Sequence, residues 1–297
     1  MTWQAKRKPE FWVPGLVRRH ALARGLLLAA PLTEPSPAAA WEAFDCAGRV
    51  RAIRGQRLRV TGRLGWGAGH PGAGGAAIEW ASRGGFDAAA FSAAVAVEHG
   101  ATRSAQARLM TRGDIQPWAI LEEVTAGQGV AVGRVSLAEG GTWQVSVPTG
   151  PAGAAQAALA VLRVCRQTRR LRLDWFDSAQ GQQWAEDVWP AGGTPAASTA
   201  NLALGDLPGD AGTAETAWRG LILGGWFWNR WLADCEVRRF AADPFAMFRR
   251  GHARDLLPAM AARLPGPVRR RVWGSLDAPD GPARARPAGP ADVYSWA

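Results

Sequence analysis

The amino-acid sequence predicts an all-β protein: a two-sheet antiparallel β-sandwich with short C-terminal helices and extended terminal arms. Three observations lead to this prediction. Apolar and polar residues alternate along several short segments, turn-forming Gly, Pro and Asp separate those segments, and helical periodicity is scarce between them. The chain has 297 residues, of which 47% are hydrophobic, so it can fill the core of such a sandwich.

Four segments carry the clearest strand patterns. An apolar run follows a basic start in His20–Leu32, and every second residue is apolar in Phe91–Val97, Trp143–Val147 and Arg170–Trp175. This alternation is typical of antiparallel strands with one face in a core and the other in solvent. The glycine-rich stretch 62–75 is expected to form a loop. The side chains that we expect in the core are Trp143, Leu171, Leu173, Ile222 and Phe240.

Two helices are expected near the C-terminus. Asp234–Ala242 has a capping Asp at its start and Pro244 just beyond its end, and Arg254–Leu264 carries an apolar stripe. We therefore divide the chain into an N-terminal arm (1–19), a sandwich (20–248) and a helical and extended tail (249–297). The two ends combine prolines, arginines and large apolar residues, a composition that suits docking on a partner. The predicted attachment residues are Trp3, Phe11, Trp12, Leu256, Leu257, Met260 and Trp273.

The chain is basic, with a formal net charge of +10, and Lys6 and Lys8 are the only lysines among its 35 basic residues. Arginine suits planar, bidentate contacts with acidic partners. The charges are scattered, with local clusters such as Arg49–Arg63 and Arg163–Arg172, and no long run of like charges is present. Nucleic-acid binding is therefore retained only as an alternative that rests on charge.

Cysteine usage and hydropathy exclude several classes of protein. Cys46, Cys165 and Cys235 are far apart and odd in number, which favours buried free thiols over a disulfide framework or a zinc knuckle. The apolar run Leu26–Leu32 is too short to span a bilayer and begins too far from Met1 for a signal peptide. We expect neither a signal peptide nor a transmembrane segment.

The acidic residues do not form a pattern that glycoside hydrolysis requires. Two catalytic carboxylates must lie on one face of the sheet, but Glu122 and Glu123 are adjacent, and Asp174 and Asp177 are an odd number of residues apart. The four histidines are dispersed, without a zinc-binding spacing. We predict no catalytic residues and no enzyme activity. A polysaccharide-degrading enzyme is kept as an alternative.

Sixteen tryptophans are the most unusual feature of the composition. Most should lie in the core, but consecutive residues of a strand face opposite ways, so Trp226, Phe227 and Trp228 cannot all enter one core. Exposed tryptophans can stack on sugar rings or line a protein interface. The candidate residues for binding a glycan or a partner are Trp184, Trp189, Trp226, Trp228, Arg170 and Arg172.

Several segments, in order, resemble the laminin-G-like domains of phage or phage-derived virion proteins, including those of gene transfer agent-like particles. The segments closest to the C-terminus carry the strongest similarity. In the strand at Thr168–Phe176 the family places a glycine after the aspartate, where this chain has Trp175. The similar segments are His20–Leu32, Asp45–Gly48, Phe91–Val97, Thr168–Phe176, Asn201–Gly205, Trp218–Ile222, Asn229–Val237 and Ala242–Phe245.

This resemblance implies a concanavalin A-like jelly-roll fold and a place in a virion, at the capsid surface or tail. It implies a decoration, spike or fibre-associated protein with a lectin-like sandwich. Such a protein would be oligomeric within its assembly and would bind other virion subunits and, in addition, host-surface glycan. Laminin-G relatives often bind calcium through loop carboxylates, and Asp206 and Asp210 are the candidates here. No other cofactor is expected.

Overall fold

The computed structural model describes residues 15–32, 41–55, 57–70, 77–100, 104–113, 117–151, 157–209, 213 and 215–249. All described residues belong to one compact unit, Met1–Gly251. The predicted helix at Arg254–Leu264 therefore lies outside the described residues.

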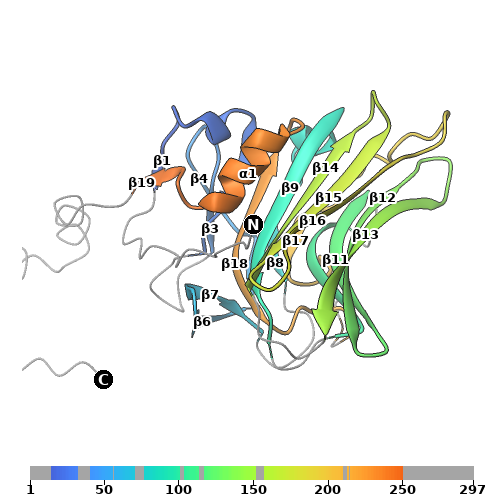
Figure 1. The fold of residues 1–297 in the computed structure, drawn as a ribbon. Helices are drawn as coiled ribbons and strands as arrows, with labels where there is room; N and C mark the ends of the chain where they lie inside the picture. Colours follow the sequence, from blue (N-terminus) through green and yellow to red (C-terminus); the bar gives the residue numbers. More distant parts are fainter. Residues whose placement is uncertain are drawn as a thin grey trace, which may run out of the picture. The chain divides into compact units, whose positions relative to one another are not determined.

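The described residues form two antiparallel sheets packed as a sandwich (Figure 1), which confirms the predicted fold class. The seven-stranded sheet has the order β13 (Thr142–Pro151), β12 (Gln128–Ser136), β11 (Trp118–Thr125), β10 (Gln106–Arg112), β17 (Leu202–Leu204), β8 (Ile78–Trp80) and β5 (Arg54–Gly55). The ten-stranded sheet has the order β16 (Gly181–Val188), β15 (Arg170–Asp177), β14 (Ala157–Cys165), β9 (Ala90–Glu98), β18 (Leu221–Trp228), β2 (Leu26–Ala30), β3 (Glu42–Phe44) and β4 (Arg49–Arg51). It also includes β7 (Gly65–Gly69), which pairs with β18, and β6 (Leu58–Gly62), which pairs with β7.

The core between the sheets follows the predicted alternation. Leu171, Leu173 and Ile222 are fully buried in it, and Trp143 is partly buried and packs against it. Phe227 lies at its centre, with its ring stacked on those of Phe91 and Trp118 at centroid distances of 5.3 and 5.6 Å. The inward faces of the strands were therefore predicted correctly from their period of two.

A second apolar layer covers the outer face of the ten-stranded sheet, the face turned away from the seven-stranded sheet. Helix α1 (Asp234–Ala242) lies there and buries Val237 and Phe240 against the sheet (Figure 1). As a result, all eight residues of β18 are buried. The predicted bounds of α1 are confirmed. Phe240 is buried as predicted, but in this outer layer rather than between the sheets.

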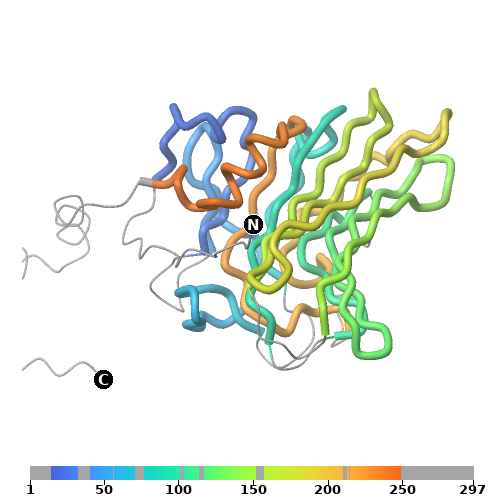
Figure 2. Tube along the Cα trace, viewed as in Figure 1, coloured from blue at the N-terminus to red at the C-terminus, as the bar shows by residue number. Residues whose placement is uncertain are grey.

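The two ends of the described chain pair with each other. β1 (Gly15–Leu16) and β19 (Phe248–Arg249) form a separate two-stranded sheet (Figure 2), and in the ten-stranded sheet β2 pairs with β18. Leu16 also packs against the outer apolar layer. This segment belongs to the predicted N-terminal arm, so its last residues dock on the chain's own sandwich. Two short 3₁₀ helices, η1 (Ala21–Ala23) and η2 (Gly84–Asp87), complete the described elements.

Two local predictions were wrong. Within the glycine-rich stretch expected as a loop, Gly65–Gly69 is strand β7, which packs so closely on β18 that a Cβ on Gly67 would come 2.5 Å from the carbonyl oxygen of Ile222. Glycine supplies that close approach between two backbones. The thiols of Cys46 and Cys235 are free, as expected, but exposed rather than buried.

Candidate functional site: the outer face of strands β14 to β16

Three neighbouring strands place charged side chains on the outer face of the larger sheet. In the register, Arg163 of β14 lies opposite Arg172 of β15, and Arg172 lies opposite Glu186 of β16. Two like charges directly opposite each other destabilise a strand pair. Asp174, two residues from Arg172 on the same face, supplies the carboxylate that both guanidinium groups need.

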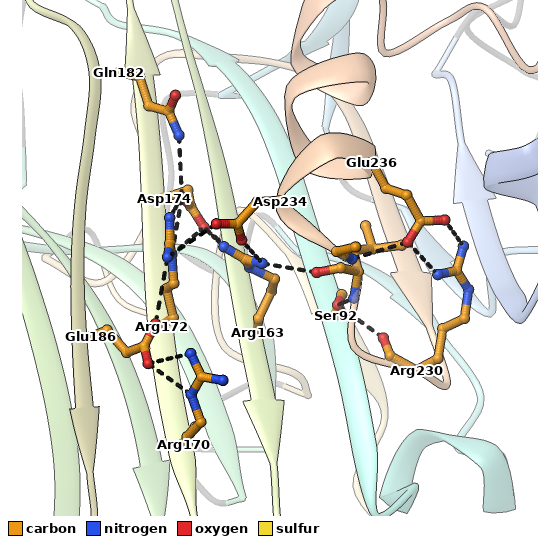
Figure 3. Close-up of polar contacts among 12 residues, drawn as sticks. Ser92, Arg163, Arg170, Arg172, Asp174, Gln182, Glu186, Arg230, Asp234 and Glu236 are labelled. Atoms are coloured by element: carbon orange, nitrogen blue, oxygen red, sulfur yellow. Dashed lines mark hydrogen bonds and ion pairs between the residues drawn. The ribbon is translucent and has the colours of Figure 1, made fainter. Parts of the chain in front are cut away.

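Asp174 lies at the centre of a buried hydrogen-bond network (Figure 3). Arg163 donates to its Oδ2 from Nη2 at 2.7 Å, and Arg172 donates to its Oδ1 from Nη2 at 2.9 Å. The side chains of Arg163 and Asp174 are both fully buried. The alternation along β15 predicted a solvent-exposed outer face here, and that prediction was wrong. Charged side chains can be buried on this face because each one is paired with an opposite charge.

Arg163 also ties this face to helix α1. Its Nη1 donates to the carbonyl oxygen of Leu232 at 2.8 Å and to Oδ1 of Asp234 at 2.7 Å (Figure 3). Ser92 of β9 accepts a hydrogen bond from the Leu232 backbone N–H at 3.0 Å. The segment that joins β18 to α1 is therefore fixed on the sheet by buried side chains from β9 and β14.

A second pair fixes the start of the helix. Arg230 donates to both carboxylate oxygens of Glu236, at 2.7 and 2.8 Å, and Glu236 accepts the backbone N–H of Ala233 at 2.9 Å. The expected cap at Asp234 is therefore one residue out: Ala233 is the N-cap, and Glu236 satisfies its N–H. Asp234 is the first residue of α1 and is used to bind Arg163.

These contacts keep the network charged. Burial pushes the pKa of Arg172 down, but its hydrogen bond to Asp174 and the charges of Asp174, Asp234 and Glu186 outweigh burial, and the pKa is raised. The hydrogen bond from Arg163 holds the pKa of Asp234 below its ordinary value, and that from Arg230 does the same for Glu236. Opposite charges at hydrogen-bond distance favour the ionised form of both partners.

Aromatic rings lie on the exposed side of this network. Trp184 of β16 is 56% exposed, and the guanidinium carbon of Arg172 lies 4.3 Å from its ring centroid. Trp231 is partly exposed, with the guanidinium carbons of Arg163 and Arg170 at 5.0 and 5.1 Å from its ring centroid. Both geometries are those of cation–π contacts. Of the residues predicted to bind a ligand, the structure therefore brings together Trp184, Arg170 and Arg172.

The other predicted tryptophans are buried within the chain. Trp226 and Trp228 lie under α1, each edge-to-face with Phe240 at centroid distances of 5.0 and 5.1 Å. Trp189 lies in the core between the sheets and donates from Nε1 to the carbonyl oxygen of Gly193 at 2.9 Å. All three are 0% exposed, so no glycan can stack on their rings. These contacts show that the three tryptophans contribute to packing within the chain.

Of the two predicted calcium ligands, the structure describes only Asp206. Asp206 is fully buried, where it accepts the Thr216 hydroxyl and the Leu207 backbone N–H, both at 2.8 Å. Asp210 lies outside the described residues, as do all the predicted attachment residues. Within the described ranges, no three His, Cys, Asp or Glu side chains lie together as a metal site would need.

The carboxylates that were considered as a catalytic pair, and those that share the outer face, accept hydrogen bonds or ion pairs from other side chains. Glu122 and Glu123 point to opposite faces, as predicted: Glu122 is buried beside His99, with 3.1 Å between Nε2 and Oε1, and Glu123 accepts from Arg134. Asp174 and Glu186 share the outer face, a pairing across strands that a search along one strand misses. Both are bound by Arg172.

Sequence reasoning missed Arg163, Asp174, Glu186 and Trp231 as members of the site. One signal was available for Arg163: it stands in β14 among almost entirely apolar residues. A charge in such a strand must be paired inside the protein. The sequence shows the basic cluster Arg163–Arg172 but not the three acidic side chains that pair with three of its five arginines, Arg163, Arg170 and Arg172. These three arginines are therefore not part of an uncompensated basic face of the kind that nucleic-acid binding requires.

No family model matches the chain, and no curated protein sequence matches it. Several solved structures do. The binding domain of botulinum neurotoxin serotype D/C VPI 5993 matches 74% of this chain and 52% of its own, with a TM-score of 0.50 and 8% identity. Trypanosoma rangeli sialidase in complex with 2,3-difluorosialic acid matches 75% of this chain and 33% of its own, with a TM-score of 0.53 and 16% identity.

These likenesses show the fold and place it among β-sandwich structures. The chain spans about half the length of the toxin domain's chain and about a third of the sialidase chain. Among the described helices, none combines the length and the apolar character that a membrane span requires.

Proposed function

We propose that this protein is a non-catalytic, lectin-like binding module that takes a glycan on the outer face of β14 to β16. The observation that carries the proposal is Trp184: a large indole that β16 leaves 56% exposed, with the guanidinium group of Arg172 beneath it. Arg172 is itself held by Asp174, so the ring rests on a rigid support. Aromatic rings held in this way are suited to stacking on the apolar face of a sugar.

The surroundings of Trp184 fit the same role. Val188 of β16 is 48% exposed, and alternation along the strand places it on the face that carries Trp184. Arg170 and Gln182 supply exposed hydrogen-bonding groups nearby. Apolar area with a few fixed polar groups is the usual composition of a ligand site. The comparisons support the proposal through the fold, since one neighbour of this fold is the binding domain of a neurotoxin.

The non-catalytic part of the proposal rests on the carboxylates. A glycosidase needs one protonated carboxylic acid and one free carboxylate on either side of the scissile bond. The acidic residues of this face are Asp174, Glu186 and Asp234, and guanidinium N–H groups bind all three. Asp174 is also sealed from solvent.

The virion role is supported by the sequence resemblance: a module of this kind would carry glycan binding on a phage or phage-derived particle.

The proposal is tested by screening the full chain on a glycan array beside two matched variants. Trp184→Ala removes the proposed platform, whereas Trp66→Ala removes another exposed indole, on β7. We expect the wild-type chain and Trp66→Ala to bind the same glycans, and Trp184→Ala to lose at least about tenfold in affinity, or about 1.4 kcal/mol. Equal losses in both variants, or none in Trp184→Ala, would place the glycan elsewhere.

A further inference from the structure

The proposed site is a row of paired charges between two indoles. Trp231 lies at one end over Arg163 and Arg170, and Trp184 lies at the other over Arg172. Between them, Glu186 accepts from Arg170 at 2.7 Å and lies 3.5 Å from Arg172. We infer that this row takes a neutral oligosaccharide of at least two sugar units, with one unit against each ring. The inference rests on the proposed function and names its ligand class.

The charge balance of the row favours a neutral ligand. Three guanidinium groups, from Arg163, Arg170 and Arg172, face three carboxylates, from Asp174, Glu186 and Asp234. An anionic sugar would have to displace Glu186 from Arg170 and would also approach the half-exposed Asp234. That repulsion opposes an acidic ligand although the whole chain is basic.

The donors and acceptors of the row also match sugar hydroxyls. A hydroxyl both donates and accepts, whereas a guanidinium only donates and a carboxylate only accepts. Arg170 and Glu186 lie side by side and are both partly exposed, so together they offer one donor and one acceptor to neighbouring hydroxyls. Their hydrogen bonds to ligand would be charge-assisted, which makes them stronger than bonds between neutral groups.

The strands that carry the two rings argue for more than one sugar unit. Trp184 stands on β16, whereas Trp231 lies against Arg163 of β14, and β15 separates these two strands, which places them roughly 10 Å apart in the sheet. The two indoles are therefore anchored over different strands, which suits a ligand of at least two sugar units. Because Asp174 and Glu186 already hold the supporting arginines, binding requires little further ordering of side chains.

The inference is tested by calorimetric titration of the full chain with a panel of hexasaccharides. Neutral glucose, galactose and mannose oligomers are compared with uronic-acid and sialic-acid oligomers of the same length, and with the corresponding monosaccharides. We expect a neutral hexasaccharide to bind at least about tenfold more tightly than its monosaccharide and than any acidic oligomer. Its affinity should change less than about twofold between roughly 0.05 and 0.3 M salt.

Two variants separate the two indoles. Trp184→Ala should weaken the hexasaccharide at least about tenfold, and Trp231→Phe, chosen to keep a ring over Arg163, should weaken it about three- to tenfold. Both variants should leave monosaccharide affinity much less affected. Binding restricted to acidic oligomers, with a steep loss in salt, would overturn the charge argument but keep the glycan function. Equal affinity for monosaccharide and hexasaccharide would overturn the two-ring argument. Failure of every sugar to bind would overturn the proposed function itself.

Discussion

Replacing Asp174 with Ala should lower the free energy of unfolding by about 3–5 kcal/mol, because the change leaves two guanidinium groups without their shared carboxylate. Arg163 is fully buried and cannot turn to solvent for compensation. Arg172 would keep only its longer contacts, to Glu186 at 3.5 Å and to Asp234 at 3.6 Å. Urea denaturation, followed by tryptophan fluorescence, measures the change.

The matched control is an ion pair on the surface. Glu42 accepts from Arg49 at 3.3 Å, and the Arg49 side chain is 46% exposed. Glu42→Ala should therefore cost no more than about 1 kcal/mol. Comparable losses for the two variants would show that Asp174 is not the buried centre of the network.

Replacing Trp226 with Ala should cost about 3–5 kcal/mol, since the indole is fully buried between β18 and helix α1. Its ring contacts Phe240 and Phe245 edge-to-face at centroid distances of 5.0 and 5.5 Å. The variant should also lose near-ultraviolet circular dichroism from the packed aromatic rings. Thermal and urea unfolding measure the loss.

Trp184→Ala is the control for that experiment. Its indole is exposed, and its main contact is the cation–π pair with Arg172, so the loss should stay near 1 kcal/mol or below. The two tryptophans then separate cleanly: Trp226 acts on stability and Trp184 on binding. A Trp226→Ala protein as stable as the wild type would contradict the assignment of the outer apolar layer.

The period-two pattern was enough to predict the sandwich and its inward faces, because each inner face packs against a whole sheet. It could not predict the outer layer. That layer exists because helix α1, which comes late in the chain, covers strands from both ends of the chain. Alternation along a strand does not indicate what covers the outer face of its sheet. In β18, with apolar or glycine residues throughout, both faces are buried, and the pattern carries no information about side.

The candidate site was predictable only in part. The sequence singled out Trp184, Arg170 and Arg172, which lie on neighbouring strands joined by a tight turn. It did not show that Arg163 and Asp234, 71 residues apart, meet through a hydrogen bond. Alternation also places Trp184 and Trp189 on opposite faces, because they are five residues apart, but only the structure shows which of the two faces is exposed.

The central claim is that the outer face of β14 to β16 binds a glycan through Trp184. Its most direct test is a nuclear magnetic resonance titration of the full chain with the tightest glycan from the array, observed at the indole N–H signals of its 16 tryptophans. Trp184→Phe and Trp231→Phe identify their two signals by loss. We predict that the Trp184 signal moves in proportion to saturation, with Trp231, while those of Trp226 and Trp228 stay in place. A saturable titration in which the Trp184 signal does not move would contradict the claim.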